Sequence, residues 1–141
     1  MAFLITGIDA EGRSCVVGET TPSTSPFESG ITVSAVASSG SCPPPPRPPG
    51  LGDLVGVASV PGVARWSIIE FPPGATTRVH HTDSLDFDVV LDGSVDLILD
   101  DGPHRLGPGD GAVINGVDHG WETHAQACRM SVVVIATPPL E

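Results

Sequence analysis

The sequence predicts an all-β protein whose short strands close into a sandwich or a small barrel. From Leu54 onward, apolar runs of four to eight residues recur at intervals of about ten residues, and Gly, Pro or Asp pairs separate most of them. Fifteen prolines and seventeen glycines among 141 residues interrupt the chain too often for long helices. No segment shows the period of an amphipathic helix, so strands are the expected elements throughout.

Three turns mark predicted hairpins. The first hairpin covers residues 3–19 (FLITGIDAEGRSCVVGE), where two β-type runs flank the turn Asp-Ala-Glu-Gly. The other two are centred on Asp92-Gly93, within LDGSVDLIL, and on Asp101-Gly102, within LILDDGPHRL. Each places an aspartate and a glycine between two apolar runs, which is the composition that tight β-turns need.

Residues 20–53 differ in composition from the rest of the chain. They are rich in Ser, Thr, Pro and Gly, and the run SCPPPPRPPGLGD cannot join a sheet ladder and favours a polyproline conformation. A ligand for an SH3 or WW domain and a stiff surface connector are both consistent with this run. We expect a connector over 38–50 without catalytic residues, and one edge strand at ITVSAV (31–36). The predicted division is therefore 1–53, an N-terminal hairpin and connector, and 54–141, a β-barrel domain.

Charge and cysteine usage exclude several classes of partner. Six basic residues, all Arg, oppose seventeen acidic ones, so the net charge is −11 and nucleic acid or an anionic membrane surface is an unfavourable partner. No run approaches the ~18 apolar residues that a membrane span requires, and the first residues lack the basic start of a signal peptide. Three cysteines form no even set for disulfides, which favours a cytoplasmic protein with reduced thiols.

Histidines at one end of a predicted strand are the first candidates for a site. In a strand, alternate residues share a face, so His80 and its neighbour His81 point to opposite sides. If His80 points into the barrel, Arg78 and Thr82 point inward with it and His81 faces solvent. An inward Arg78 either clamps a substrate carboxylate or pairs with an aspartate.

Carboxylates and a distant histidine complete the predicted site. The same alternation returns Asp86 and Asp88 to the inner face, and His119 and Trp121 share a face of a later strand. His80, Asp86 and His119 together offer two imidazoles and one carboxylate, which suits one divalent transition metal with positions left for substrate. Asp88 or Asp86, with its pKa raised by burial, is the candidate base.

Two stretches resemble the motifs of the small single-domain cupins. The first stretch, PGATTRVHHTDSLDFDVVLDG, matches the pattern G-x5-H-x-H-x3/4-E-x6-G at Gly74, His80 and Gly93. Asp86 stands at the glutamate of that pattern and Thr82 replaces its second histidine, as in a cupin subgroup with His-x-Thr-x-Ser-x-Asp. The second stretch, LGPGDGAVINGVDHGW, matches the later motif through its PGD turn, a glycine and His119.

The resemblance implies a double-stranded β-helix, or jelly-roll barrel, around one divalent metal (Fe, Mn, Ni or Zn), in a chain that forms a homodimer. His80, Asp86 and His119 are then the metal ligands, Asp88 and Arg78 the catalytic residues, and Thr82 and Trp121 pocket residues. The family motifs do not define a reaction. A metal-dependent decarboxylase, dehydratase or isomerase acting on a small organic acid or carbonyl compound, in secondary metabolism, is the first hypothesis. A non-catalytic small-molecule-binding cupin and a non-haem iron dioxygenase are the alternatives.

Overall fold

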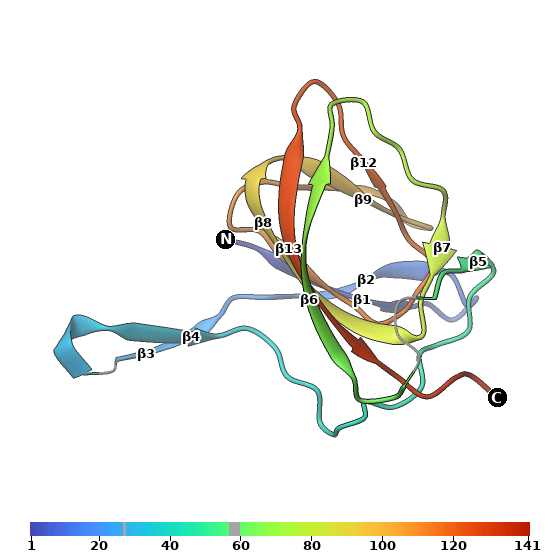
Figure 1. Ribbon diagram of the computed structural model, residues 1–141, viewed down its shortest axis with the longest axis horizontal. Coiled ribbons are helices and arrows are strands. Elements are labelled where there is room, and N and C mark those ends of the chain that lie inside the picture. Colours follow the sequence, from blue (N-terminus) through green and yellow to red (C-terminus); the bar gives the residue numbers. More distant parts are fainter. Residues whose placement is uncertain (27, 57–59) are drawn as a thin grey trace.

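The computed structural model describes residues 1–26, 28–56 and 60–141, and strands make up nearly all of its regular structure (Figure 1). The strands are β1 Phe3–Ile8, β2 Ser14–Thr20, β3 Ser23–Pro26, β4 Thr32–Ala35, β5 Asp53–Leu54, β6 Ala64–Phe71, β7 His80–His81, β8 Ser84–Gly93, β9 Val95–Leu99, β10 Gly102–Leu106, β11 Gly111–Ile114, β12 Gly120–Glu122 and β13 Cys128–Ala136. One 3-10 turn, Glu28–Gly30, is the helical element of the described residues. The predicted all-β class is confirmed.

Two sheets face each other and form the barrel. The larger sheet has the strand order β2-β1-β11-β8-β13-β6, and the smaller has the order β10-β9-β12. The chain before β7 runs antiparallel to β12, with bridges between Thr76 and Glu122 and between His80 and His119, so it extends the smaller sheet irregularly. This arrangement is the predicted jelly roll (Figure 1).

Two of the three predicted hairpins are confirmed. β1 pairs antiparallel with β2, and β9 pairs antiparallel with β10. The hairpin predicted around Asp92-Gly93 is wrong, because β8 and β9 lie in different sheets. Both edges of β8 are already occupied by β11 and β13, so β9 crosses to the opposite layer. Gly93 makes this crossing with a φ of 73°, and a Cβ there would lie 1.8 Å from the Ala127 carbonyl oxygen.

Apolar side chains from both sheets fill most of the barrel. Buried and less buried residues alternate along β13 and the middle of β8, as the two-residue period requires, whereas all four residues of β11 are buried. Removing these side chains from water supplies the main driving force for folding. The largest fully buried side chains are Leu97, Leu106, Ile114, Met130, Val90, Val95 and Val117.

The Pro-rich segment packs against the barrel and is more than a surface connector. Pro44 and Arg47 are buried, although most of the prolines around them are exposed. The Arg47 guanidinium donates from Nε to Asp83 at 2.8 Å and from Nη1 to the Pro48 carbonyl at 2.7 Å. The predicted surface connector is thus also joined to the barrel by the ion pair between Arg47 and Asp83.

Residues 20–36 form a projecting arm. The strand predicted at 31–36 is present as β4, but it pairs with β3 in a separate two-stranded sheet rather than at the edge of the barrel. Figure 1 shows this arm extending away from the body. The first hairpin, in contrast, joins the barrel, since β1 pairs in parallel with β11. The domain division at residue 53 stays a prediction.

Among the residues that the structure describes, no helix is long and apolar enough to cross a bilayer.

Candidate active site inside the barrel

His80 and His119 face each other where the two motifs meet. Each residue donates its backbone N–H to the carbonyl of the other, at 2.9 and 2.8 Å, so the two Cα positions are fixed side by side. The centroids of the imidazole rings lie 4.5 Å apart. Two histidines from separate motifs are thus brought together by backbone pairing.

Hydrogen bonds select one tautomer for both imidazoles. Nδ1 of His80 lies 2.9 Å from the Arg78 carbonyl, and Nδ1 of His119 lies 2.8 Å from the Val117 carbonyl. A carbonyl oxygen only accepts, so Nδ1 carries a proton in each ring, and in the neutral tautomer Nε2 is left with the lone pair. Burial lowers the pKa of His119 to about 4, which keeps this imidazole neutral at physiological pH. Both Nε2 atoms are therefore available as ligands.

Asp86 and Asp88 form a buried carboxyl pair on the inner face of β8. Their exposed fractions are 7% and 5%, and one oxygen of Asp88, Oδ1, has no hydrogen-bond partner among the described residues. Burial raises the pKa of Asp86 to about 6, opposed by a hydrogen bond from Ser84. Burial and the nearby charge of Asp86 raise the pKa of Asp88 well above its usual value. Both carboxyl groups therefore hold their protons to a higher pH than an exposed aspartate does.

A chain of hydroxyl groups orients Asp86. Ser84 donates its hydroxyl hydrogen to Oδ1 of Asp86 at 2.6 Å, and Thr82 Oγ1 lies 2.6 Å from Ser84 Oγ. Since Ser84 has one hydrogen and uses it on Asp86, Thr82 is the donor to Ser84. All three side chains are buried. Thr82 and Ser84 thus hold the carboxylate of Asp86, which stands at the glutamate position of the first motif.

The histidine pair fits a divalent metal as two of its ligands. Neutral imidazoles whose Nδ1–H groups are held by backbone carbonyls are typical of metal-binding histidines. Within residues 1–26, 28–56 and 60–141, however, no group of three or more His, Cys, Asp or Glu side chains lies close enough to hold a metal ion. Asp86 instead accepts a hydrogen bond from the Ser84 hydroxyl. The three-ligand set of His80, Asp86 and His119 stays a prediction.

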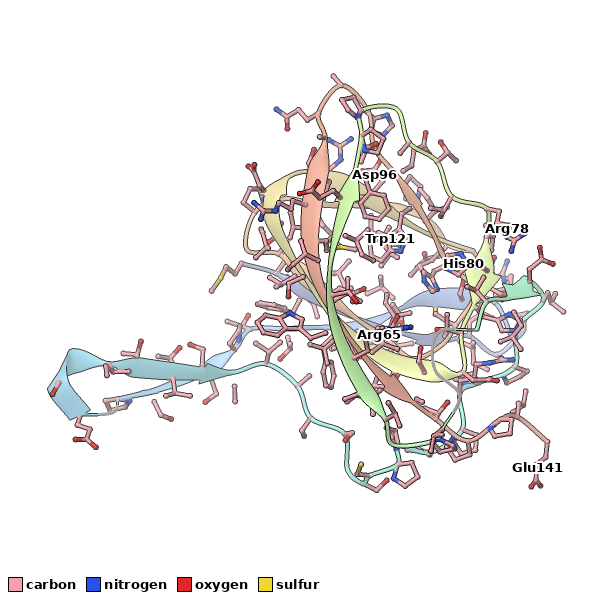
Figure 2. The ribbon with its side chains drawn as sticks, in the orientation of Figure 1. Arg65, Arg78, His80, Asp96, Trp121 and Glu141 are labelled. Carbon is pink, nitrogen blue, oxygen red and sulfur yellow. The ribbon has the colours of Figure 1, made fainter. Side chains whose placement is uncertain are left out.

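Arg78 lies outside the barrel, so the expectation that it points inward is wrong. Its side chain is 69% exposed and pairs with Asp53 at 3.4 Å. Residues 77–79 are not part of a strand, and strict alternation therefore does not extend back from His80. In Figure 2, Arg78 points away from the space that His80 and Trp121 adjoin.

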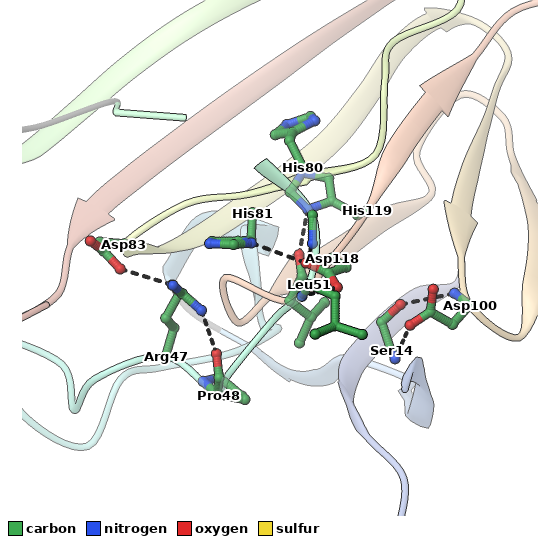
Figure 3. A network of polar contacts seen from close by, with 12 residues as sticks. Ser14, Arg47, Pro48, Leu51, His80, His81, Asp83, Asp100, Asp118 and His119 are labelled. Atoms are coloured by element: carbon green, nitrogen blue, oxygen red, sulfur yellow. Dashed lines mark hydrogen bonds and ion pairs between the residues drawn. The ribbon is translucent and has the colours of Figure 1, made fainter. Parts of the chain in front are cut away.

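His81 faces away from His80 as predicted, but it is buried rather than exposed. Its Nδ1 lies 3.1 Å from Oδ1 of Asp118, whose carboxylate also accepts the backbone N–H groups of Leu51 and Gly52 (Figure 3). These bonds lower the pKa of Asp118 against the opposing effect of burial. The end of the connector covers this face of β7, which alternation within one strand could not reveal.

Arg65 is an inward-facing cation that the sequence reasoning missed. The pairing register places Arg65 of β6 opposite Val134 of β13, which lies opposite Asp86 of β8, so the three residues form one row on the inner face. Arg65 is exposed because β6 is the outer strand of its sheet. In Figure 2, Arg65 extends from β6 toward the side of the sheet on which His80 and Trp121 lie. Counting back in twos from Phe71 through ARWSIIEF would have indicated this orientation.

Trp121 packs beside the histidine pair. Its ring meets the His119 imidazole edge-on, with centroids 6.0 Å apart and planes at 81°, and it also lies 6.3 Å from the Phe71 ring. Edge-on packing of this kind fixes the orientation of both rings. Trp121 is thus part of the wall beside His119.

Comparison with known proteins identifies the family. The family model for the cupin domain matches residues 67–136, which include both histidines and both carboxylates. The chain therefore belongs to the cupin family, as its two motifs predicted.

Similar proteins include two from the fungus Diaporthe leptostromiformis. Phomopsin biosynthesis cluster protein C' is 39% identical over 97 residues, covering 67% of this chain and 48% of that protein. Phomopsin biosynthesis cluster protein D is 40% identical over 85 residues, covering 58% of this chain and 45% of that protein. The chain thus spans about half the length of these relatives. Among solved structures, the polyketide cyclase RemF from Streptomyces resistomycificus is 32% identical, with a TM-score of 0.49, over 51% of this chain and 54% of that one.

Proposed function

We propose that the protein is a biosynthetic cupin enzyme that transfers protons on a small organic acid or carbonyl compound inside the barrel, by decarboxylation, dehydration or isomerisation. The observation that carries this proposal is the buried carboxyl pair, with an oxygen of Asp88 that has no partner among the described residues. An unsatisfied buried carboxyl oxygen costs free energy. Its retention beside a second carboxyl is explained if a substrate atom supplies the missing hydrogen bond.

The two carboxyl groups take different roles in this mechanism. Burial and the nearby charge of Asp86 raise the pKa of Asp88 well above its ordinary value, so Asp88 takes the role of the acid that protonates a substrate oxygen or carbon. Asp86 has a pKa of about 6 and is ionised at neutral pH, so it is the base. The hydrogen bond from Ser84 occupies one oxygen of Asp86 and leaves the other to receive the substrate proton.

His80 and His119 would hold a divalent metal, Fe, Mn, Ni or Zn, through Nε2. When bound, such a metal supplies a Lewis acid that polarises a substrate carbonyl. The backbone carbonyls of Arg78 and Val117 keep both imidazoles in the required tautomer.

Arg65 replaces Arg78 as the group that recognises an anionic substrate. Arg65 lies on the inner face of β6 in the same cross-strand row as Asp86, so its positive charge lies on the side of the sheet where an anionic substrate would bind. Trp121 shields the reacting atoms from water. Both relatives described above are named as biosynthesis cluster proteins, which supports a role in secondary metabolism.

Exchange of substrate hydrogen for solvent deuterium tests the proposal across many candidate substrates at once. Metal-loaded protein is incubated in deuterium oxide with a panel of keto and hydroxy acids, and proton NMR follows the loss of hydrogens next to each carbonyl. We expect hydrogen exchange with at least one compound, and Asp86→Asn and Asp88→Asn should each lower the exchange rate at least ~100-fold. Asp92→Asn should change this rate little, because Asp92 is an exposed carboxylate at the end of the same strand. If an acid binds but is neither exchanged nor turned over, the protein is a small-molecule-binding cupin and not an enzyme.

A further inference from the structure

A cavity of about 590 Å³ lies between the Pro-rich connector and the outer side of the larger sheet. Ile5 of β1, Leu85 of β8 and Val113 of β11 line it from the sheet. Leu85 directly precedes Asp86, so its side chain points away from the barrel interior, and the residues on either side of Val113 belong to the core. The cavity is therefore a different space from the one that contains the histidine pair and the carboxyl pair.

The connector forms the opposite wall of the cavity, over residues 36–40 and 44–48. Arg47 fixes this wall, since its guanidinium donates to Asp83 at 2.8 Å and to the Pro48 carbonyl at 2.7 Å (Figure 3). A wall that is held in place before a ligand arrives loses little conformational freedom when the ligand binds. The cavity is thus preformed by the fold.

A buried hydroxyl group at this cavity has no hydrogen-bond partner. Thr137 directly follows β13, lines the cavity and is only 5% exposed, and its Oγ1 forms no hydrogen bond with the residues that the structure describes. Its backbone N–H donates to the Asp83 carbonyl at 3.0 Å, which holds it beside the Arg47 ion pair. A buried, unpaired hydroxyl costs free energy that a valine of the same shape would avoid. A ligand that bonds to Oγ1 explains why a threonine stands here.

The other lining groups define which molecule fits. Among the residues that line the cavity, Arg47 is the charged one, and Asp83 compensates its charge. The net charge of −11 on the whole chain further disfavours an anion. The prolines at 44–46 offer ring faces of the kind that pack on aromatic side chains when Pro-rich segments are recognised. The matching ligand is neutral and aromatic, with one polar group for Thr137.

We propose that this cavity, which we call the connector pocket, binds a neutral aromatic molecule that carries a hydroxyl group. The aromatic ring packs between Leu85 and the prolines at 44–46, and the hydroxyl bonds to Oγ1 of Thr137. The volume lies within the range of roughly 300–1,000 Å³ that is usual for small-molecule sites. Such a ligand differs in charge from the organic acid proposed for the barrel interior, so the two sites select different compounds. The proposal does not depend on the acid–base role of the carboxyl pair.

Isothermal titration calorimetry of the full chain with three probes of similar shape tests the proposal. The probes are 1-naphthol, naphthalene and 1-naphthoate at pH 7, which differ in the presence of a hydroxyl group and of a negative charge. We expect one 1-naphthol to bind per chain and 1-naphthoate to bind at least ~10-fold more weakly, because no free cation lines the pocket to offset its desolvation. The absence of saturable binding of 1-naphthol to the folded protein overturns the proposal.

The variant Thr137→Val tests the assigned hydrogen bond. It should weaken the binding of 1-naphthol about 5-fold, as the loss of one neutral hydrogen bond does, and leave naphthalene unaffected. Thr76→Val is the matched control, because Thr76 is an exposed threonine in the segment that pairs with β12 and does not line the pocket. Equal binding of 1-naphthol to Thr137→Val and to the unmodified protein contradicts the assignment.

The variant Ala37→Trp tests the location from the connector side. Ala37 is exposed and lines the pocket, so an indole at this position should fill the space without disturbing the core. We expect it to lower the affinity for 1-naphthol and for naphthalene alike, by at least ~10-fold. A variant that circular dichroism shows to be folded and that binds both probes normally would place them elsewhere.

Proton NMR of the unmodified protein with 1-naphthol gives the location without any variant. Nuclear Overhauser effects should connect the probe to the methyl groups of Leu85 and Val113 on the outer side of the sheet. Contacts with the indole of Trp121 and none with these methyl groups would place the probe inside the barrel and overturn the proposal.

Discussion

At the scale of single residues, what matters is which face each polar side chain occupies. Alternation along β8 predicted correctly that Asp86 and Asp88 share the inner face, because this strand is regular over both positions. The same rule failed for Arg78, which precedes a two-residue strand and lies on the surface. It also could not show that His81 is covered, since the covering residues come from a segment 30 positions earlier.

The buried carboxyl pair predicts how stability depends on pH. A raised pKa means that the folded chain keeps a proton which the unfolded chain loses, so stability falls as pH rises from the ordinary value of 3.8 toward the raised value of Asp88. Asp88→Asn removes this ionisation while keeping a similar shape. We expect its melting temperature to exceed that of the unmodified protein, by a margin that is small near pH 4 and larger at about pH 8.

Thermal unfolding followed by circular dichroism at several pH values checks this prediction. Asp92→Asn is the control, because this aspartate lies exposed at the end of the same strand. An Asp88→Asn variant that is less stable than the parent at every pH would show that the Asp88 carboxylate forms favourable contacts in the folded state.

Metal content distinguishes the two adjacent histidines. His80→Ala and His119→Ala each remove an imidazole whose Nε2 is available, and we expect a loss of metal affinity of at least ~10-fold. His81→Ala should retain metal, because its Nδ1 is committed to Asp118 on the other face. Elemental analysis after identical loading gives the comparison, and Asp86→Ala in the same series tests the third predicted ligand. Loss of metal in His81→Ala with retention in His80→Ala would contradict the assignment.

At the scale of elements, most strands and two hairpins follow from local sequence, whereas partners across the barrel do not. The turn at Asp92-Gly93 has the composition of a hairpin, yet both edges of β8 are taken by strands from distant positions. The connector shows the same principle. Its prolines predict an irregular path correctly, but the burial of Arg47 depends on Asp83, a residue 36 positions away.

The Arg47 ion pair gives the connector a measurable role in stability. Arg47→Ala removes two hydrogen bonds from a buried guanidinium and leaves Asp83 without its cation, so the free energy of unfolding should fall by about 2 kcal/mol. Arg13→Ala, which breaks a solvent-exposed pair with Asp9, should lower the free energy of unfolding much less. Urea denaturation of both variants tests the difference. If both variants lower the free energy of unfolding by the same amount, the ion pair between Arg47 and Asp83 does not stabilise the fold more than an exposed pair does.

At the scale of the whole molecule, the jelly roll places distant motifs around one interior. The all-β class and the cupin family could be predicted from turn spacing and from two short motifs. The place of Arg65 on the inner face and the position of the arm could not be predicted from the sequence. The first depends on the order of strands in the larger sheet, and the second on the pairing of β3 with β4 away from that sheet. Inside the barrel, Asp86 lies in the cross-strand row of Arg65 and Val134, and Asp88 lies in the neighbouring row of Val132.

Carbon-13 NMR of aspartate carboxyl groups in metal-free protein most directly tests the central claim, the acid–base role of Asp86 and Asp88. Burial predicts one carboxyl that titrates near pH 6, from Asp86, and a second, from Asp88, whose titration is shifted well above the ordinary value of 3.8. The second signal should be absent in Asp88→Asn. If every aspartate of the folded protein titrates below about pH 5, the interior holds no proton-bearing carboxyl pair, and the proposed acid–base role of Asp86 and Asp88 is contradicted.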